Sequence, residues 1–349
     1  ADLMADLREF YLAGDASHEQ VRAKLEEWGV AVLVRHFSAA QAEEWKRGSI
    51  DWLKRLCGNK LKETQTGWKT EYLPAGPRDG MFQSLFSNAP TVWEMRDALY
   101  PLFSGVLEER ELLTSLDGGS IYPVKDHISA ARDWAHIDQT VTGIKCVQGQ
   151  VVLSDSLAAF RCTPTSHKHH DRILKICGRE GDTRNWLLFN DSQLVQVKKL
   201  IPEHYWQVPI HAPAGSVIFW RSNTIHSSVV APVHPSLKEL ATTWASESAD
   251  AEVRRTLKFG HRGWRTVAYI CMQPKERFAQ HQAYALKDAA LKGRMTNHWG
   301  TRIFTKGFRG PKSIPMTALL RNPEKTARKA EDLSPLSKKL IGIDEWVEE

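Results

Sequence analysis

Long apolar runs are missing from this sequence. The clean apolar stretches are short, such as Val217 to Trp220, and a membrane-spanning helix needs roughly 18 apolar residues. No basic segment followed by a hydrophobic one stands near the N-terminus, so we expect no secretory signal and an intracellular, by default cytoplasmic, protein. Because the chain begins at Ala1 rather than Met, the question of a leader before Ala1 stays open.

Cysteine is also scarce. The five cysteines show no CxxC pair and no regular spacing (Cys57, Cys146, Cys162, Cys177, Cys271). An odd, sparse set predicts reduced, mostly buried thiols in a reducing compartment and argues against a zinc cluster. Internal repeats and obvious linkers are absent as well, so we predict one domain over residues 1–349.

Acidic residues are rare in one part of the chain. Between Arg254 and Ala330 there are 18 Lys and Arg but 3 Asp and Glu, a local charge of +15 that leaves −9 for the rest of a chain with net +6. A basic segment indicates nucleic acid, an anionic substrate or a solvated face, and the last is the commonest.

The first third of the sequence, residues 1–110, is predicted to be mainly helical. Ser17 is a typical N-cap before the amphipathic stretch Val21 to Trp28, which ends at Gly29. An apolar run, Val30 to Val34, then predicts a short buried strand, and Ser38 precedes a predicted helix over 39–56. Residues 61–90 favour strands and loops, and 91–107 favour helix.

From residue 112 to 273 short strand-like runs dominate, separated by turn signals. Such a pattern predicts a mainly β fold with surrounding helices, built on a jelly-roll core, the double-stranded β-helix. We expect insertions near 171–199 and 232–263, and a basic helical or irregular part over 274–349. The predicted strands are Leu112–Tyr122, Gly143–Leu153, Tyr205–Ile210, Ser216–Trp220 and Trp264–Met272.

Three residues offer a metal site. His136 and Asp138 form an H-x-D pair, and residues two apart on a strand project from the same face, although the pair alone is weak evidence. His226 follows the apolar strand that ends at Trp220, where a sheet rim is expected. Two neutral imidazoles and one carboxylate are the facial triad of non-haem iron(II) oxygenases, which leaves open coordination positions.

These residues resemble the phytanoyl-CoA dioxygenase-like family of iron(II)/2-oxoglutarate oxygenases, and the resemblance covers most of the chain. His136-Ile137-Asp138 looks like the family's H-x-D motif, and Gly215 to Ser228 looks like its strand and distal H-x-S. Residues 25–33 and the helix after Ser38 are similar to its opening. Pro164 to Lys168 is similar to its Pro-Gly-Thr/Ser-His-Lys turn, with Thr165 in place of the usual glycine.

The resemblance implies Fe(II), 2-oxoglutarate and O2 as cofactor and cosubstrates. It implies an arginine on a strand after the distal histidine as the anchor of the 2-oxoglutarate carboxylate, and a hydroxyl two residues past that histidine. Arg265 and Ser228 match these positions. Because 39 positions separate Arg265 from His226, more than is usual in the family, Arg254, Arg255 and Arg262 remain rivals.

Other polar residues have open roles. Gln148 and Gln150 lie on one face of a predicted strand, where they contact cosubstrate or a metal ligand, or form a polar sheet face. Tyr122 is a further cosubstrate candidate. Trp134 and Trp220 are expected to pack against the site. We interpret the cluster His167, His169 and His170 as turn or surface residues, and Arg294 to Trp299 could line the entrance without an assigned mechanism.

The function that follows is an oxygenase that couples decarboxylation of 2-oxoglutarate to oxidation of an aliphatic C–H bond, by hydroxylation, desaturation or cyclisation. Asp138 retains its carboxylate, whereas related halogenases have a small residue there, so halogenation is not expected. The basic surroundings favour a small anionic metabolite as substrate. A nucleic-acid base oxygenase and a non-catalytic jelly-roll binding protein are the alternatives.

Overall fold

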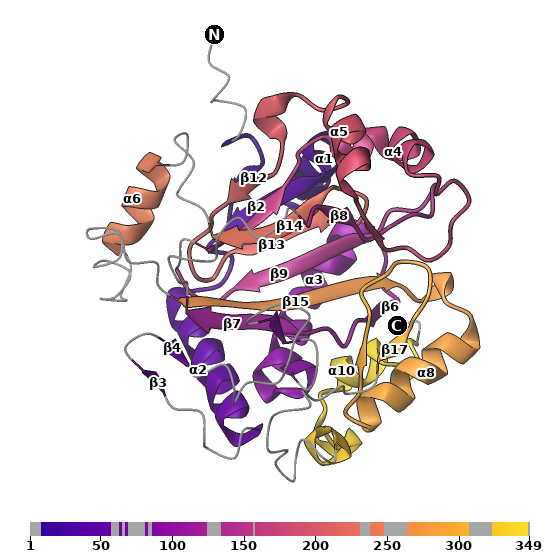
Figure 1. Ribbon diagram of the computed structural model, residues 1–349. Coiled ribbons are helices and arrows are strands. Elements are labelled where there is room, and N and C mark those ends of the chain that lie inside the picture. Colours follow the sequence, from indigo (N-terminus) through magenta and orange to yellow (C-terminus); the bar gives the residue numbers. More distant parts are fainter. Residues whose placement is uncertain are drawn as a thin grey trace.

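Two β-sheets packed face to face, with helices around them, make up the protein in this computed structural model (Figure 1). The structure describes residues 8–56, 63–64, 67–68, 81–82, 86–123, 134–155, 158–230, 238–247, 264–306 and 323–347. In this described part, no helix is both long enough and apolar enough to cross a membrane.

The larger sheet has eight strands, and its pairings are antiparallel except for the parallel pair β1–β2. The order is β1 (Tyr11–Ala13), β2 (Val30–Val34), β13 (Val217–Arg221), β9 (Val147–Val152), β15 (Trp264–Pro274), β7 (Gly119–Pro123) and β5 (Met81–Phe82), with β6 (Leu112–Thr114) paired to β15. The smaller sheet is antiparallel and runs β11 (Leu187–Leu188), β8 (His136–Ile137), β14 (His226–Val230), β10 (Ala158–Cys162) and β12 (Val208–Ile210).

Alternation along the strands explains why the larger sheet is buried on both faces. In β2, Val30 and Val32 face the smaller sheet, whereas Ala31 and Leu33 face the helices. Side chains two apart share a face of a strand, so a continuous apolar run suits a strand that is covered on both sides. The layer between the sheets also contains Phe160 and Ile210 from the smaller sheet.

Helices cover the outer faces and one end of the sheets. The helices α1 (His18–Trp28), α2 (Ala39–Leu56) and α3 (Pro90–Leu107) share a core with the larger sheet. Beside the smaller sheet lie α4 (His170–Ile176) and α5 (Asp191–Lys198), whereas α8 (Gln280–Leu291) and α10 (Pro335–Leu340) pack together with β6. The remaining described elements are α6 (Lys238–Glu247), the pair β3 (Glu63–Thr64) and β4 (Gly67–Trp68), and the pair β16 (Met295–Thr296) and β17 (Thr305–Lys306).

Most of the predicted elements in the N-terminal third are confirmed. Ser17 caps α1 through a capping box, and Gly29 ends the helix in the left-handed conformation, with φ 75°. The strand over 30–34 and the helix over 39–56 have the predicted bounds, and α3 begins one residue earlier than predicted. This third is not only helical, however, because β1 and β2 extend the larger sheet.

Two predicted strands have different bounds in the structure, and the predicted insertion contributes a strand to the smaller sheet. The run 112–122 is broken into β6 and β7, and the run 205–210 begins with a 3-10 turn, so that only β12 is strand. The predicted insertion 171–199 is not peripheral, since its strand β11 pairs with β8 beside the predicted metal ligands. Most of 61–90 and of 232–263 lies outside the described residues.

Candidate metal centre

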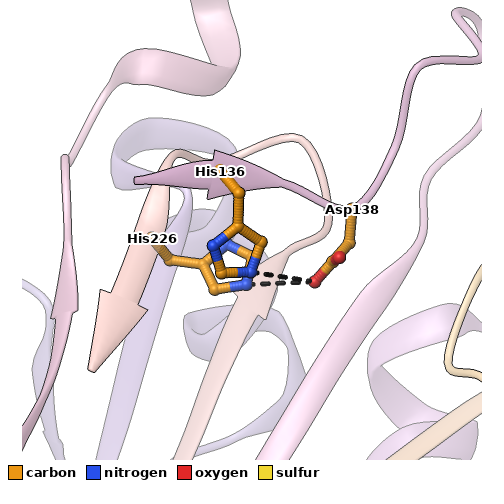
Figure 2. Close-up of side chains that lie close together, drawn as sticks. All are labelled: His136, Asp138 and His226. Carbon is orange, nitrogen blue, oxygen red and sulfur yellow. Dashed lines mark ion pairs between the residues drawn. The ribbon is translucent and has the colours of Figure 1, made fainter. Parts of the chain in front are cut away.

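His136, Asp138 and His226 meet in the smaller sheet. His136 opens β8 and lies opposite His226, the first residue of β14, in the register of the two strands. Asp138 follows β8, where its backbone N–H donates to the carbonyl of Ser222 at 2.8 Å. Both imidazole rings point toward the Asp138 carboxylate (Figure 2). The strand pairing therefore brings together residues that are 90 positions apart.

The spacing of the three side chains fits one ion. His226 Nε2 lies 3.1 Å and His136 Nε2 3.8 Å from Oδ2 of Asp138. One ligand atom from each residue lies within 4.8 Å of those of the other two. In the described part of the chain, no second group of His, Cys, Asp and Glu side chains meets this criterion.

Both histidines are held in the tautomer that a metal needs. The Nδ1 atom of His136 lies 3.0 Å from the carbonyl of Trp134, and that of His226 lies 2.9 Å from the carbonyl of Thr224. A carbonyl can only accept, so each Nδ1 carries the hydrogen and each Nε2 keeps its lone pair. Hydrogen bonds of this kind fix the ring orientation of metal ligands.

The electrostatic surroundings favour a neutral ring for His136 and an ionised carboxylate for Asp138. Burial, followed by the neighbouring His226, lowers the pKa of His136 to about 3, so its ring is neutral near pH 7. Burial opposes the charge of Asp138, but the neighbouring imidazoles, His298 first, outweigh it and hold its pKa well below the usual value. Two imidazoles and one carboxylate fit a divalent transition metal, and the donor set contains no thiolate.

Gln148 contacts the metal-ligand candidate Asp138. This side chain, 4% exposed, donates from Nε2 to Oδ2 of Asp138 and lies equally close, at 3.1 Å, to the hydroxyl of Ser222. The sequence predicts that Gln148 contacts the cosubstrate or a metal ligand, or lies on a polar sheet face. In the structure it contacts the candidate ligand Asp138. Trp134 stacks on His136 at 4.7 Å, and Trp220 lies 5.6 Å from the ring of His226, as expected for packing residues.

A cavity is lined in part by Phe160, whose ring is 5.8 Å from that of His226. Arg265, 3% exposed, and Gln150, 1% exposed, both line it. The Oε1 atom of Gln150 is buried and has no hydrogen-bond partner among the described residues. The cavity is lined by Gln150, Val152, Ser154, Phe160, Ile210, Ala212, Ile218, Arg265 and Val267.

Arg265 belongs to a small polar network. Its Nη2 donates to the hydroxyl of Tyr269 at 3.4 Å, and that hydroxyl lies 2.9 Å from the hydroxyl of Ser120. The cavity therefore combines apolar walls with the polar side chains of Gln150, Ser154 and Arg265.

The other predicted cosubstrate residues have less defined places. Ser228 is half-buried on β14, where its carbonyl accepts from Nε1 of Trp134 at 3.1 Å, and it is not among the residues that line the cavity. Tyr122 pairs with Arg265 between β7 and β15, but its side chain lies outside the described residues. The rival arginines, Arg254, Arg255 and Arg262, also lie outside them.

One residue beside the centre had no assigned role in the sequence. His298, in the segment between β16 and β17, has its Nε2 3.1 Å from Oδ2 of Asp138, while its Nδ1 lies 2.6 Å from Oδ2 of Asp117. The sequence predicts for the segment Arg294 to Trp299 only a place at the entrance to the site. Nothing in its composition connects it with a motif 160 positions earlier.

The second histidine cluster does not join the centre. His167 bonds through Nε2 to the carbonyl of Glu26 at 2.9 Å, and His170 through Nε2 to that of Gln139 at 2.7 Å. His167 ends up in the turn that the sequence predicted, and Thr165 precedes it with φ 67°. Glycine adopts that left-handed backbone more easily than threonine does.

No protein-family model matches the sequence, and a search of curated proteins gives no match. Solved structures do match. A putative oxidoreductase from Salmonella typhimurium LT2 is 14% identical, with TM-score 0.53, over 97% of this chain and 88% of that one. A hypothetical protein of Escherichia coli, JW0805, gives the same four values.

A third solved structure has a lower TM-score. The epimerase SnoN, solved in complex with Fe3+ and alpha ketoglutarate, is 12% identical, with TM-score 0.41, over 73% of this chain and 83% of its own. At these identities the likeness to solved structures concerns the fold alone.

Proposed function

We propose that this protein is an iron(II)/2-oxoglutarate-dependent oxygenase, formed as a single domain in which the two facing sheets are a double-stranded β-helix of the phytanoyl-CoA dioxygenase-like kind. The observation that carries the proposal is the convergence of His136, Asp138 and His226 within 4.8 Å, buried at the rim of the smaller sheet. Three protein ligands on one side of an ion leave positions for a bidentate 2-oxo acid and dioxygen.

The cavity beside the centre supports 2-oxoglutarate as cosubstrate. Of the polar side chains that line it, Arg265 and Gln150 are almost fully buried. A carboxylate can accept two N–H groups of one guanidinium, so a 2-oxo acid with a second carboxylate fits a cavity that Arg265 lines. We assign Arg265 as the anchor, with Gln150, Ser228 and Tyr122 as further contacts, and Gln148 as a support of Asp138.

When bound, iron(II) together with 2-oxoglutarate and dioxygen would supply the oxidant for an aliphatic C–H bond. The chain's own part is to orient the substrate and to exclude water. His136 and His226 would hold the metal through Nε2, and Asp138 would hold it through a carboxylate oxygen. The retained carboxylate of Asp138 favours hydroxylation, desaturation or cyclisation over halogenation.

A small anionic molecule is the proposed substrate. The basic segment 254–330 has a local charge of +15, which raises the local concentration of anions. Trp186, with 46% of its surface exposed, lies with its ring 6.5 Å from that of His136. An exposed indole next to a predicted metal ligand offers a flat apolar contact for such a substrate.

The first experiment adds iron(II) and 2-oxoglutarate without oxygen. A visible charge-transfer band is expected for the wild type and for the control His281→Ala, whose histidine lies exposed on α8. His226→Ala should lose the band. If wild type and His226→Ala gave the same spectrum, the proposed metal site would be wrong.

Release of succinate and carbon dioxide under air then separates an enzyme from a binding protein. A protein that binds iron and 2-oxoglutarate but never turns over, with any of a panel of small anionic metabolites, would be the non-catalytic alternative.

The same basic segment keeps a nucleic-acid base oxygenase as the second candidate. Phosphate contacts make binding fall steeply with salt. Binding to single-stranded or duplex oligonucleotides at low salt, lost at higher salt, would favour it. Absence of binding at low salt would remove it.

A further inference from the structure

His298 lies between two buried carboxylates. Its Nδ1 is 2.6 Å from Oδ2 of Asp117, and its Nε2 is 3.1 Å from Oδ2 of Asp138. Asp117 and Asp138 are 5% and 3% exposed. Because a carboxylate only accepts, Nδ1 donates to Asp117, and Nε2 on the other side of the ring lies against Asp138.

Asp117 is itself held in place. Its Oδ1 accepts from the backbone N–H of Gly118 at 2.8 Å, which leaves Oδ2 for His298. Strand β6 ends at Thr114, and Leu116 exchanges hydrogen bonds with Thr296: the Leu116 N–H donates to the Thr296 hydroxyl at 2.8 Å, and the Thr296 N–H donates to the Leu116 carbonyl at 3.1 Å. The two segments that carry Asp117 and His298 are therefore fastened to each other.

The segment that carries His298 is also fixed internally. Asn297 closes it, since its Nδ2 donates to the carbonyl of Arg302 at 3.0 Å and its Oδ1 accepts from the N–H of Phe304 at 2.7 Å. Gly300 lies against Cys146, so that a Cβ at this position would be 2.7 Å from the Cys146 Cβ. Such close packing leaves the imidazole of His298 little freedom.

Oδ2 of Asp138 is the point where these contacts converge. Gln148, on β9, donates to this oxygen at 3.1 Å. The Nε2 atom of His298, from the C-terminal part of the chain, lies at the same distance from it. The Nε2 atom of His298 is sealed from solvent and makes no well-aligned hydrogen bond among the described residues, so Asp138 is its close polar neighbour at 3.1 Å. Ligating carboxylates are oriented by such outer partners.

We propose that His298 is a positioning residue of the metal centre: anchored by Asp117, its ring fixes the carboxylate of Asp138 and makes the segment 295–306 a part of the site. The inference rests on the proposed metal site but not on the identity of the cosubstrate. The contacts Asp117–His298–Asp138 also hold the segment 295–306 against the sheets, because they join this segment to the proposed metal ligand.

The test measures binding of cobalt(II) alone, by calorimetry and by the visible ligand-field spectrum. Outer partners of metal ligands change affinity by about 10–100-fold when removed. His298→Ala should therefore weaken cobalt(II) binding by about that factor, and His298→Gln, which keeps one N–H donor, should restore part of it. Asp117→Asn should change affinity in the same direction by a smaller factor, although it does not touch Asp138.

Three outcomes are distinguished by controls. Absence of cobalt(II) binding by wild type would refute the proposed metal site itself. If both His298 variants bind cobalt(II) with wild-type affinity while His226→Ala does not bind it, the proposed role of His298 is wrong but the metal site stands. An affinity that rises in His298→Ala would show that the ring competes with the metal for Asp138, and would also overturn the proposal.

Folding is controlled separately. Gly300→Ala disturbs the packing of the same segment on Cys146 without replacing Asp117, Asp138 or His298. If His298→Ala and Gly300→Ala lower the unfolding temperature of the metal-free protein equally, but only His298→Ala alters the spectrum of bound cobalt(II), the effect of His298 is on the site. Equal spectra would make its role merely structural and contradict the proposal.

Discussion

Gln148 donates a hydrogen bond from Nε2 to Oδ2 of Asp138 at 3.1 Å. Its neighbour two positions along β9, Gln150, lines the cavity that also contains Arg265. One face of one strand thus contacts the proposed metal ligand at Gln148 and lines the proposed cosubstrate pocket at Gln150. The two glutamines can be separated by parallel substitutions, since they have the same chemistry and similar burial.

The first prediction uses this pair. Gln148→Leu removes the donor to Asp138 and should weaken iron(II) binding by about 10–100-fold, with little change in the KM for 2-oxoglutarate once iron is saturating. Gln150→Leu should do the reverse and raise the KM for 2-oxoglutarate while iron(II) affinity stays near that of wild type. Calorimetry and succinate release measure the two quantities. Equal effects of both substitutions on both quantities would contradict the division of roles.

The second prediction concerns Arg265. Arg265→Lys keeps the charge but loses the planar, bidentate grip, so the KM for 2-oxoglutarate should rise by about 10-fold or more, as expected when a charge-assisted hydrogen bond of about 1.5–3 kcal/mol is lost. Iron(II) affinity should not change. Tyr269→Phe, which removes the hydroxyl 3.4 Å from Nη2 of Arg265, serves as the milder control.

An unchanged KM in Arg265→Lys would shift the anchor to one of Arg254, Arg255 and Arg262. The same assay on these three single lysine variants would then identify it.

The elements that the sequence predicted well have local causes. The helix α1 has a capping box at Ser17 and a left-handed end at Gly29, and both depend on residues within the helix and at its ends. The apolar run of β2 matches a strand buried on both faces. The predicted metal ligands needed one further step, because His226 and His136 become neighbours only through the pairing of β14 with β8.

What the sequence could not predict depends on long-range contacts without a local pattern. His298 and Asp117 are 181 positions apart, and neither belongs to a recognisable spacing. The strand β11 has only two residues, and its role follows from its partner β8 and not from its own sequence. The runs that break early, such as 112–122, contain polar residues that bond to other segments: the hydroxyl of Ser115 accepts from the N–H of Cys271 at 3.1 Å.

The third prediction follows from the backbone of Thr165. With φ 67°, this residue adopts the left-handed region, which costs roughly 1–2 kcal/mol for a side chain with a Cβ. Glycine removes that cost but adds about 0.5–1 kcal/mol of chain entropy. Thr165→Gly should therefore be neutral to stabilising, with an increase of up to about 1.5 kcal/mol in the free energy of unfolding.

The control is Thr165→Ala, which keeps the Cβ in the same backbone and should bring no gain. Urea unfolding of the metal-free variants measures both. A clear loss of stability in Thr165→Gly alone would show that contacts of the threonine side chain outweigh the backbone cost.

The last prediction is a pH dependence carried by His167. Burial lowers the pKa of His167 from 6.5 to about 4. The ring is 7% exposed, its Nε2 lies against the carbonyl of Glu26, and its Nδ1 is buried without a hydrogen-bond partner among the described residues. The folded protein therefore resists a proton that the unfolded chain takes up below about pH 6.5.

The sign follows from proton uptake. Between pH 6.5 and pH 4 the unfolded state binds more protons, so stability is complete above this window and falls as the pH is lowered through it. One pKa unit corresponds to about 1.4 kcal/mol, so the loss from pH 7 to pH 5 should be about 2 kcal/mol. Urea unfolding of metal-free wild type and of His167→Gln at both pH values measures it. The variant, which keeps a donor for Glu26 but cannot titrate, should lose about 2 kcal/mol less than wild type over this range; an identical loss in both proteins would assign the acid sensitivity to other groups.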